Sequence, residues 1–359
     1  MRPPGFHVGP CGLRHQEAIV SHLNSPGAAL SRRRLLTGLG GALVGSALLT
    51  ACGSDDADSS SNDGRTTIRL AGIPASALAA FKLALKEGAF EEAGLDIRYE
   101  EYAESAAVYT AYRAGQVDGG LGGIPSTANL VATGVDRKVV FALQRTTNGI
   151  LVRADSGIQS IADLKGRKLG LFGSAIGSST NQFFALCREK HGFNPTTDCQ
   201  VQYGAPNLMA ELLGQGDVDM ALVIDPAGAP ELASGKYRSL GDLGVLLEEA
   251  TGLKAFTAGW DFASEFIEKN REAVQAFVDV NLRYQTRFNN DQSLWDAALR
   301  ELYNIDDQAV LDVIWNSQRG RLVEQWGDAE KQQAAQLLTF LSENGEPEFL
   351  PKVPDGLFA

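Results

Sequence analysis

From residue 66 onward, short apolar segments that suit β-strands alternate with longer segments that have the spacing of amphipathic helices. Residues 67–72 (TIRLAG) have the length and composition of a strand, and residues 77–90 place Leu78, Phe81 and Leu85 on one side of a helix. The alternation predicts an α/β fold with a parallel sheet and helices on both faces. Further strands are expected at 95–102, 117–124 and 138–143, and further helices at 105–114 and 125–132.

The alternation then starts again, which indicates a second α/β unit. An internal echo supports two similar halves, because Ala114–Leu121 parallels Gln215–Leu222. In each, a helix ends at glycine, Val-Asp opens a strand, and a proline stands at the start of the next helix. Chance similarity is the alternative for so short a match. The second unit is expected to hold strands at 149–153, 168–172, 200–203 and 218–224, a helical turn at 161–164, and helices at 178–190, 208–213 and 226–234.

The last third of the chain changes character, since residues 260–326 have an almost entirely helical pattern. We expect these helices to pack back on the first unit, so that the chain crosses between units near 144–148 and again near 251–256. Two crossings make a hinge, and hinged α/β lobes enclose a cleft. The predicted division is a first lobe of 66–146 plus 256–359 and a second lobe of 147–255.

The N-terminal segment has the features of an export signal. Ser31–Leu36 (SRRRLL) is typical of a twin-arginine signal, and the apolar stretch up to Ala51 is too short and glycine-rich for a spanning helix. It ends in Leu49-Thr50-Ala51-Cys52, which resembles a bacterial lipobox. We therefore predict a signal peptide over 1–51, a lipidated Cys52 and a disordered polar tether over 52–65. A cleaved soluble signal or an uncleaved anchor helix is the alternative.

Composition excludes several classes of function. Residues 1–51 carry five arginines and one acid, so the remainder has 27 basic and 43 acidic residues and a net charge of −16. A body this acidic repels phosphate backbones, which argues against nucleic acid as a partner. His191 is the one histidine after residue 51, and no Cys-x-x-Cys pair occurs. We therefore expect neither a structural zinc site nor a histidine-rich catalytic metal site. No cofactor and no catalytic residues are predicted either, since binding by lobe closure needs none.

Ligands of open α/β sheets bind beyond the carboxyl ends of the strands, where helix starts offer free N–H groups that favour anions. Four such junctions occur, at 72–76, 123–127, 173–180 and 224–228. The third, GSAIGSST, combines glycines that admit a close approach with hydroxyl donors, although a serine N-cap is an equal alternative for any one serine. The candidate ligand-binding residues are Pro74, Ser76, Ile124, Pro125, Ser126, Thr147, Asn148, Gly173, Ser174, Ser178, Ser179 and Asp225.

Asp225 comes after four apolar residues, at the mouth of the expected cleft. Its carboxylate is predicted to bind an amine or hydroxyl of the solute, while also capping the next helix; a helix N-cap alone is the alternative. Tyr102 and Trp260 are candidates for the wall of the site, with buried packing as the favoured interpretation of both.

Cys187 and Cys199 lie on a predicted helix and beside the next strand. After export they are candidates for a disulfide that clasps the second lobe, and reduced buried thiols are the alternative.

Two motifs resemble a known family. Gly157–Gly170 (GIQSIADLKGRKLG) resembles a segment of the substrate-binding proteins of ABC transporters, specifically the nitrate/sulfonate/taurine or SsuA/THI5-like group. Gly216–Asp219 followed by Ile224-Asp225-Pro226 is similar to the "G-x-V-D-A…W-D-P" segment of that group. The resemblance covers roughly residues 66–340.

The resemblance implies a periplasmic-binding-protein type II fold of two α/β lobes, joined by a two-segment hinge, with a helical C-terminal region on the first lobe. It implies a monomeric extracytoplasmic lipoprotein that delivers a small-molecule ligand to an ABC permease and its ATPase. The loop 173–180 corresponds to the anion-facing loop, and Asp225 to the acid that faces the amine in taurine-type members. Ile224 stands where the family often has tryptophan, which leaves other sulfonates, nitrate-like anions and pyrimidine precursors as candidate ligands.

Two alternatives to an importer component arise from the same resemblance. Some THI5-like proteins are enzymes that make a pyrimidine precursor with an active-site histidine and PLP, but this chain has no evident PLP lysine motif. The other alternative is a lipoprotein sensor that presents its ligand to a receptor kinase. A serine hydrolase is disfavoured as well, because the chain has no Gly-x-Ser-x-Gly elbow.

Overall fold

The computed structural model describes residues 64–346 and 349–359. The predicted export signal, the lipidated Cys52 and all but the end of the predicted tether lie outside the described residues.

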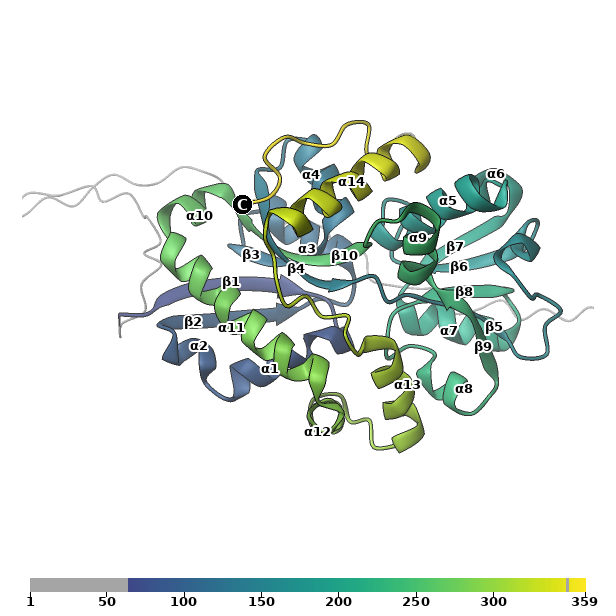
Figure 1. The fold of residues 1–359 in the computed structure, drawn as a ribbon, viewed down its shortest axis with the longest axis horizontal. Helices are drawn as coiled ribbons and strands as arrows, with labels where there is room; N and C mark the ends of the chain where they lie inside the picture. Colours follow the sequence, from purple (N-terminus) through teal and green to yellow (C-terminus); the bar gives the residue numbers. More distant parts are fainter. Residues whose placement is uncertain (1–63, 347–348) are drawn as a thin grey trace, which may run out of the picture. The chain divides into compact units, whose positions relative to one another are not determined.

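The first sheet has five strands, and one of them runs against its neighbours. Its order is β2-β1-β3-β10-β4, and β10 is antiparallel to both β3 and β4 (Figure 1). The predicted parallel sheet does not include this antiparallel strand, and the expected helical region does not begin at residue 260, because β10 continues to Ala263. The strands are β1 Thr66–Gly72, β2 Leu95–Glu101, β3 Gly119–Gly123, β4 Arg137–Arg145 and β10 Phe256–Ala263.

The second sheet repeats this arrangement in the order β7-β6-β8-β5-β9. Here β5 is the strand that runs against its neighbours β8 and β9. The strands are β5 Gly149–Arg153, β6 Lys168–Phe172, β7 Gln200–Gly204, β8 Met220–Val223 and β9 Tyr237–Asp242.

The inverted strands result from the short links between the sheets. Residues 146–148 alone join β4 to β5, so the chain leaves the first sheet at its carboxyl edge and enters the second at the nearest edge. Gly149 at the start of β5 pairs with Val223 at the end of β8, and Phe256 at the start of β10 pairs with Arg145 at the end of β4. Residues 252–255 form the second link, between the helix Leu243–Thr251 and β10, so both links meet the first sheet at its carboxyl edge.

Helices cover both sheets, mostly where the spacing predicted them. In the first sheet's lobe, α1 and α11 cover one face and α4 the other (Figure 1). The helix predicted over 77–90 is interrupted, because Gly88 adopts a positive φ of 73° between α1 and α2. The elements of this lobe are η1 Ser76–Leu78, α1 Ala79–Lys86, α2 Ala89–Glu92, α3 Ser105–Arg113, α4 Ile124–Ala132, α10 Ser264–Lys269, α11 Arg271–Asn290 and α12 Gln292–Tyr303. Those of the second lobe are η2 Ile161–Leu164, α5 Ser178–His191, α6 Pro195–Asp198, α7 Pro206–Gln215, α8 Ala229–Ala233 and α9 Leu243–Thr251.

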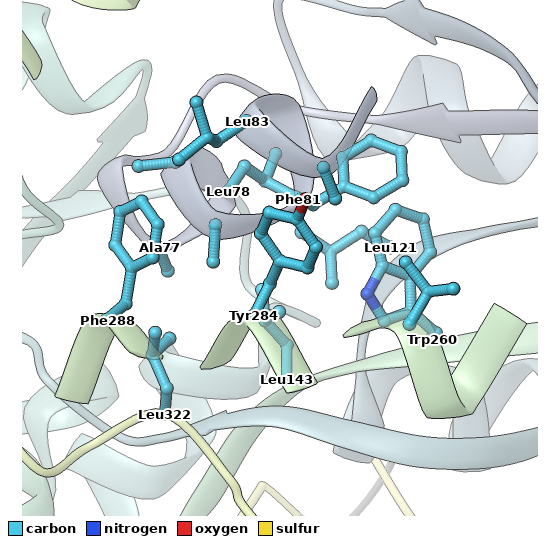
Figure 2. Close-up of a cluster of buried hydrophobic side chains, with 14 of the residues drawn as sticks. Ala77, Leu78, Phe81, Leu83, Leu121, Leu143, Trp260, Tyr284, Phe288 and Leu322 are labelled. Carbon is cyan, nitrogen blue, oxygen red and sulfur yellow. The ribbon is translucent and has the colours of Figure 1, made fainter. Parts of the chain in front are cut away.

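Aromatic rings fill the core between α1, α11 and the first sheet. Figure 2 shows Phe81 and Leu121 beside Trp260, whose ring centroid lies 4.8 Å from that of Phe81. Phe277 packs against Trp260 edge to face at 5.2 Å. Trp260 is fully buried in this core, so it packs in the interior, as the favoured interpretation expected, and does not form a wall of the ligand site.

A buried ion pair crosses from β4 to β10. The guanidinium of Arg137 donates to the carboxylate of Asp261, and the two side chains are 2% and 0% exposed. Thr127 donates to the same carboxylate at 2.8 Å, and the Arg137 guanidinium stacks on the ring of Tyr112 at 3.6 Å. The pair thus ties α3, α4 and two strands together.

Strand β3 (GGLGG) is almost without side chains, because its neighbours occupy the space. A Cβ added to Gly119 would lie 2.6 Å from the ring of Phe262, and one added to Gly120 would lie 2.6 Å from the carbonyl oxygen of Ala71. The side chains that face these glycines are Phe262, Tyr112, Asp261 and Ser178.

The last two helices, α13 Gln308–Gln318 and α14 Asp328–Asn344, contact both lobes. Leu337 and Leu341 of α14 belong to the apolar core of the second lobe, whereas Ala334 and Leu338 pack with Ile124 of α4. The predicted helical C-terminal region is present, but it does not rest on the first lobe alone. None of the helices in the described ranges combines the length and the apolar character that a bilayer-spanning segment needs.

Candidate functional site

A cavity of about 380 Å³ lies where the carboxyl edges of the two sheets meet. Strand ends and helix starts from both lobes form its wall, as expected for an α/β fold of this kind. The helices whose first turns contribute are α3, α4, α5 and α7. The volume suits one small organic molecule.

The start of α5 is the most polar part of the wall. Gly177 precedes this helix and supplies no side-chain cap, so the N–H groups of its first turn remain available to a ligand. The helix dipole adds positive potential at the same place. Ser179 lies in this turn; it is 3% exposed, and its hydroxyl has no hydrogen-bond partner among the described residues.

The start of α4 is hydrogen-bonded directly to the start of α5 beside the cavity. The backbone N–H of Ser126 donates to Ser178 Oγ at 3.1 Å, and the Ser126 hydroxyl donates to the carbonyl of Ile176 at 3.1 Å. The two serine hydroxyls lie 3.0 Å apart. Since Ser126 belongs to the first lobe and Ser178 to the second, these bonds join the lobes beside the ligand space.

Sequence reasoning missed the contribution of helix α3 to the cavity wall, which α3 lines along its whole length. Glu104, Tyr109 and Arg113 all line the cavity. The Tyr109 hydroxyl accepts from the N–H of Gly123 at 3.3 Å, and burial raises the pKa of this phenol. A signal exists, because Ser105, Tyr109 and Arg113 recur every four residues on one helix face, but an ordinary solvated face has the same spacing.

Residues near the crossings complete the polar wall. Gln144 and Asn148 are 7% and 1% exposed, and their amide oxygens have no partner among the described residues. Thr257 of β10 lies beside them in the wall. Amide groups of this kind can donate to, or accept from, a bound solute.

The structure brings half of the predicted ligand residues to the cavity. Ser126, Asn148, Gly173, Ser174, Ser178 and Ser179 line it, whereas Pro74, Ser76, Ile124, Pro125, Thr147 and Asp225 do not. At two junctions neighbouring residues line the cavity instead, namely Ile73 and Ala75 in the first and Ile224 in the fourth.

Asp225 is held from behind the cavity wall. Its carboxylate accepts from the Ser317 hydroxyl and, at 2.9 Å, from the side-chain amide of Gln318, both on α13. Gln318 also donates to Thr147 in the first link, at 3.2 Å. Burial raises the pKa of Asp225 to about 6, although both hydrogen bonds oppose the rise. Nor does this side chain cap α8, whose N-cap is Gly228.

The two cysteines of the second lobe are unbonded thiols. Cys199 Sγ donates to the carbonyl of Leu164 at 3.3 Å, and burial raises the pKa of both thiols. Within the described ranges, no three His, Cys, Asp or Glu side chains gather as a metal site would require. Tyr102 lies outside the wall, where its hydroxyl donates to Glu100.

A family model described as "NMT1/THI5 like" matches residues 76–288. No curated protein sequence is significantly similar to this chain.

Solved structures share the fold. The periplasmic aliphatic sulphonate binding protein SsuA from Escherichia coli is 22% identical, with a TM-score of 0.64 over 80% of this chain and 95% of that one. The alkanesulfonate-binding protein SsuA from Xanthomonas axonopodis pv. citri, bound to MOPS, is 19% identical, with a TM-score of 0.63 over 79% and 96%. The periplasmic nitrate-binding protein NrtA from Synechocystis PCC 6803 is 15% identical, with a TM-score of 0.57 over 69% of each chain. The fold is therefore that of the periplasmic binding proteins.

Proposed function

Since the chain belongs to the NMT1/THI5-like family, we propose that it is an extracytoplasmic solute-binding protein of an ABC importer and not an enzyme. It binds one small anionic or zwitterionic solute, such as a sulfonate, nitrate or taurine, and passes it to a permease driven by an ATPase. The observation that carries this proposal is the convergence of helix starts from two lobes on one cavity, with the buried Ser179 hydroxyl unpartnered among the described residues.

The proposed mechanism is closure of the lobes, 66–146 plus 256–359 and 147–255, around the solute. The short links provide the hinge, and the bonds between Ser126 and Ser178 form when the lobes meet. A solute that contacts both lobes favours the closed state only by its higher affinity for that state. Neutral hydroxyls and N–H groups at the α5 start bind an anion without placing a full positive charge beside it.

The residues of the wall support binding rather than catalysis. No histidine, cysteine or lysine occurs among the described residues that line the cavity, and its two charged residues are Glu104 and Arg113. His191 stands at the end of α5, opposite the end that faces the cavity.

A thermal-shift screen of the purified protein tests the proposal. Sulfonates, taurine, nitrate and pyrimidines are the compounds to compare. A solute present at a hundred times its Kd stabilises the folded state by about 2.7 kcal/mol and raises the melting temperature. If no compound raises it, the proposed ligand classes are wrong.

Ser179→Ala tests the site itself. A hydrogen bond to a charged group is worth about 1.5–3 kcal/mol, so we expect the affinity for the solute to fall by about tenfold or more, measured by calorimetry. Thr180→Val is the matched control, because Thr180 carries a buried hydroxyl that also lacks a partner among the described residues but does not line the cavity. Equal losses in both variants would remove Ser179 from the site.

A further inference from the structure

The contacts of Asp225 join parts of the molecule that lobe closure must move. Asp225 comes after β8 of the second lobe, whereas Leu311 and Ile314 place α13 in the core of the first, where Ala229 of α8 also packs. The carboxylate accepts from Ser317 and Gln318 on α13, and the carbonyl of Asp225 accepts from the N–H of Ser76 at 3.3 Å. None of the four residues that make these bonds lines the cavity, whereas Ser126 and Ser178 both do.

Ile224, next to Asp225 in the chain, connects the hydrogen-bonded group of Asp225, Ser317 and Gln318 to the ligand cavity. Ile224 lines the cavity, so the position of the Asp225 backbone sets the position of that wall. Gln318 also donates to Thr147, one residue before Asn148, which lines the cavity as well. A change at Asp225 therefore reaches two wall residues without any contact between its carboxylate and the solute.

We propose that Asp225, Ser317 and Gln318 form a latch that holds the lobes closed, an inference that rests on the proposed function. Asp225 is then a positioning residue for solute binding. Breaking the latch favours the open state and lowers the affinity for every solute, since the fraction of binding-competent protein falls.

The environment of the latch makes closure depend on proton uptake. Asp242 at the start of α9 is the charged group whose field reaches Asp225, and it is itself paired with Arg321 at 3.8 Å. The other groups that face Asp225 are uncharged, namely Ser317 and Gln318 on α13, the Ser76 N–H in η1 and Thr147 in the link through Gln318. Burial in the closed state raises the pKa of Asp225 to about 6, whereas exposure on opening returns it toward 3.8.

A lower pH therefore favours the closed state. A carboxyl whose pKa is higher in the closed state favours closure when it is protonated, so closure strengthens as the pH falls through about 6 and weakens above it. Between about pH 8 and pH 5 the closed-to-open ratio rises by about tenfold, if opening exposes the carboxyl fully. Butanesulfonate is a suitable probe, because its own charge is constant over this range.

Small-angle scattering of the ligand-free protein and calorimetry with butanesulfonate together test the latch. We expect the wild type to become more compact and to bind more tightly, by up to about tenfold, at about pH 5 than at about pH 8. Asp225→Asn keeps an oxygen that accepts from both donors and has no charge to titrate, so it stays compact and tight-binding at both pH values. Asp225→Ala loses the latch and is expanded and weak-binding at both.

Asp312→Asn is the control, since Asp312 is an exposed carboxylate on the same helix and should leave the wild-type pH profile unchanged. The latch is wrong if Asp225→Ala and Asp225→Asn behave alike, or if either keeps the pH profile of the wild type. Absence of butanesulfonate binding with an intact scattering response would instead contradict the sulfonate part of the proposed function and leave the latch in place.

Discussion

At the scale of single residues, the buried pair of Arg137 and Asp261 differs from the many ion pairs on the surface. Both side chains are almost fully excluded from solvent, and burial raises the pKa of Asp261 while Arg137 and Thr127 oppose the rise. Removal of one partner therefore leaves a buried charge without compensation. An exposed pair such as Arg287 with Glu87, at 3.1 Å, has water as an alternative partner.

Arg137→Leu should lower the free energy of unfolding by about 3–5 kcal/mol, measured by urea denaturation at neutral pH. Arg287→Leu is the matched control and should cost no more than about 1 kcal/mol. Similar losses in the two variants would mean that solvent reaches Asp261, in contrast to the structure.

At the scale of elements, α14 is the helix that most constrains the lobes. Leu341 packs beside Phe183 and Phe184 in the second core, and Leu338 packs beside Ile124 and Val139 of the first lobe. One helix therefore contributes to the stability of both lobes, which couples their unfolding.

Leu338→Ala and Leu341→Ala should each lower stability by about 2–5 kcal/mol, since both side chains are fully buried. Because α14 joins the two cores, we expect one cooperative thermal transition in the wild type and in both variants, measured by calorimetry. Two separate transitions, each responding to one variant, would show that α14 does not couple the lobes.

The sequence predicts most elements, including the strand at 149–153, but neither strand β10 nor the reversed direction of these two strands. Apolar runs such as 138–143 and 168–172 have the composition of buried strands, and their positions are confirmed. Residues 256–263 are equally apolar but run directly into helices, so the sequence pattern does not separate this strand from the helical region after it. Strand direction depends on which edge a short link enters, and no local pattern encodes that.

Only half of the predicted ligand-binding residues line the cavity, because local sequence signals do not encode long-range contacts. Glycines and serines at strand-to-helix junctions signal a helix start, and Ser126, Ser178 and Ser179 are examples in the wall. Asp225 has the same local signal, but its partners Ser317 and Gln318 stand 92 and 93 positions later in the chain. Tertiary contacts of that range decide whether a side chain faces a cavity or a helix behind it.

At the scale of the whole molecule, the lipid anchor predicted at Cys52 would hold the protein at the membrane. We expect Cys52→Ser to move the protein from the membrane fraction to the soluble extracytoplasmic fraction, because the thiol is the proposed site of acylation. Cys11→Ser is the control and should stay with the membrane. Retention of Cys52→Ser in the membrane fraction would contradict the anchor and favour an uncleaved helix.

The glycine strand β3 determines how this protein can change over evolutionary time. The side chains of Phe262, Tyr112, Asp261 and Ser178, and at Gly120 also the backbone carbonyl of Ala71, leave no room for a Cβ on the glycines of β3, so a larger residue there becomes tolerable only after a neighbour has shrunk or the backbone has shifted. Such paired steps are rare in random drift, and a saturation library should find this strand among the least permissive segments. A lineage that acquires a new solute will therefore change the first turns of α3 and α5 and keep β3 as it is.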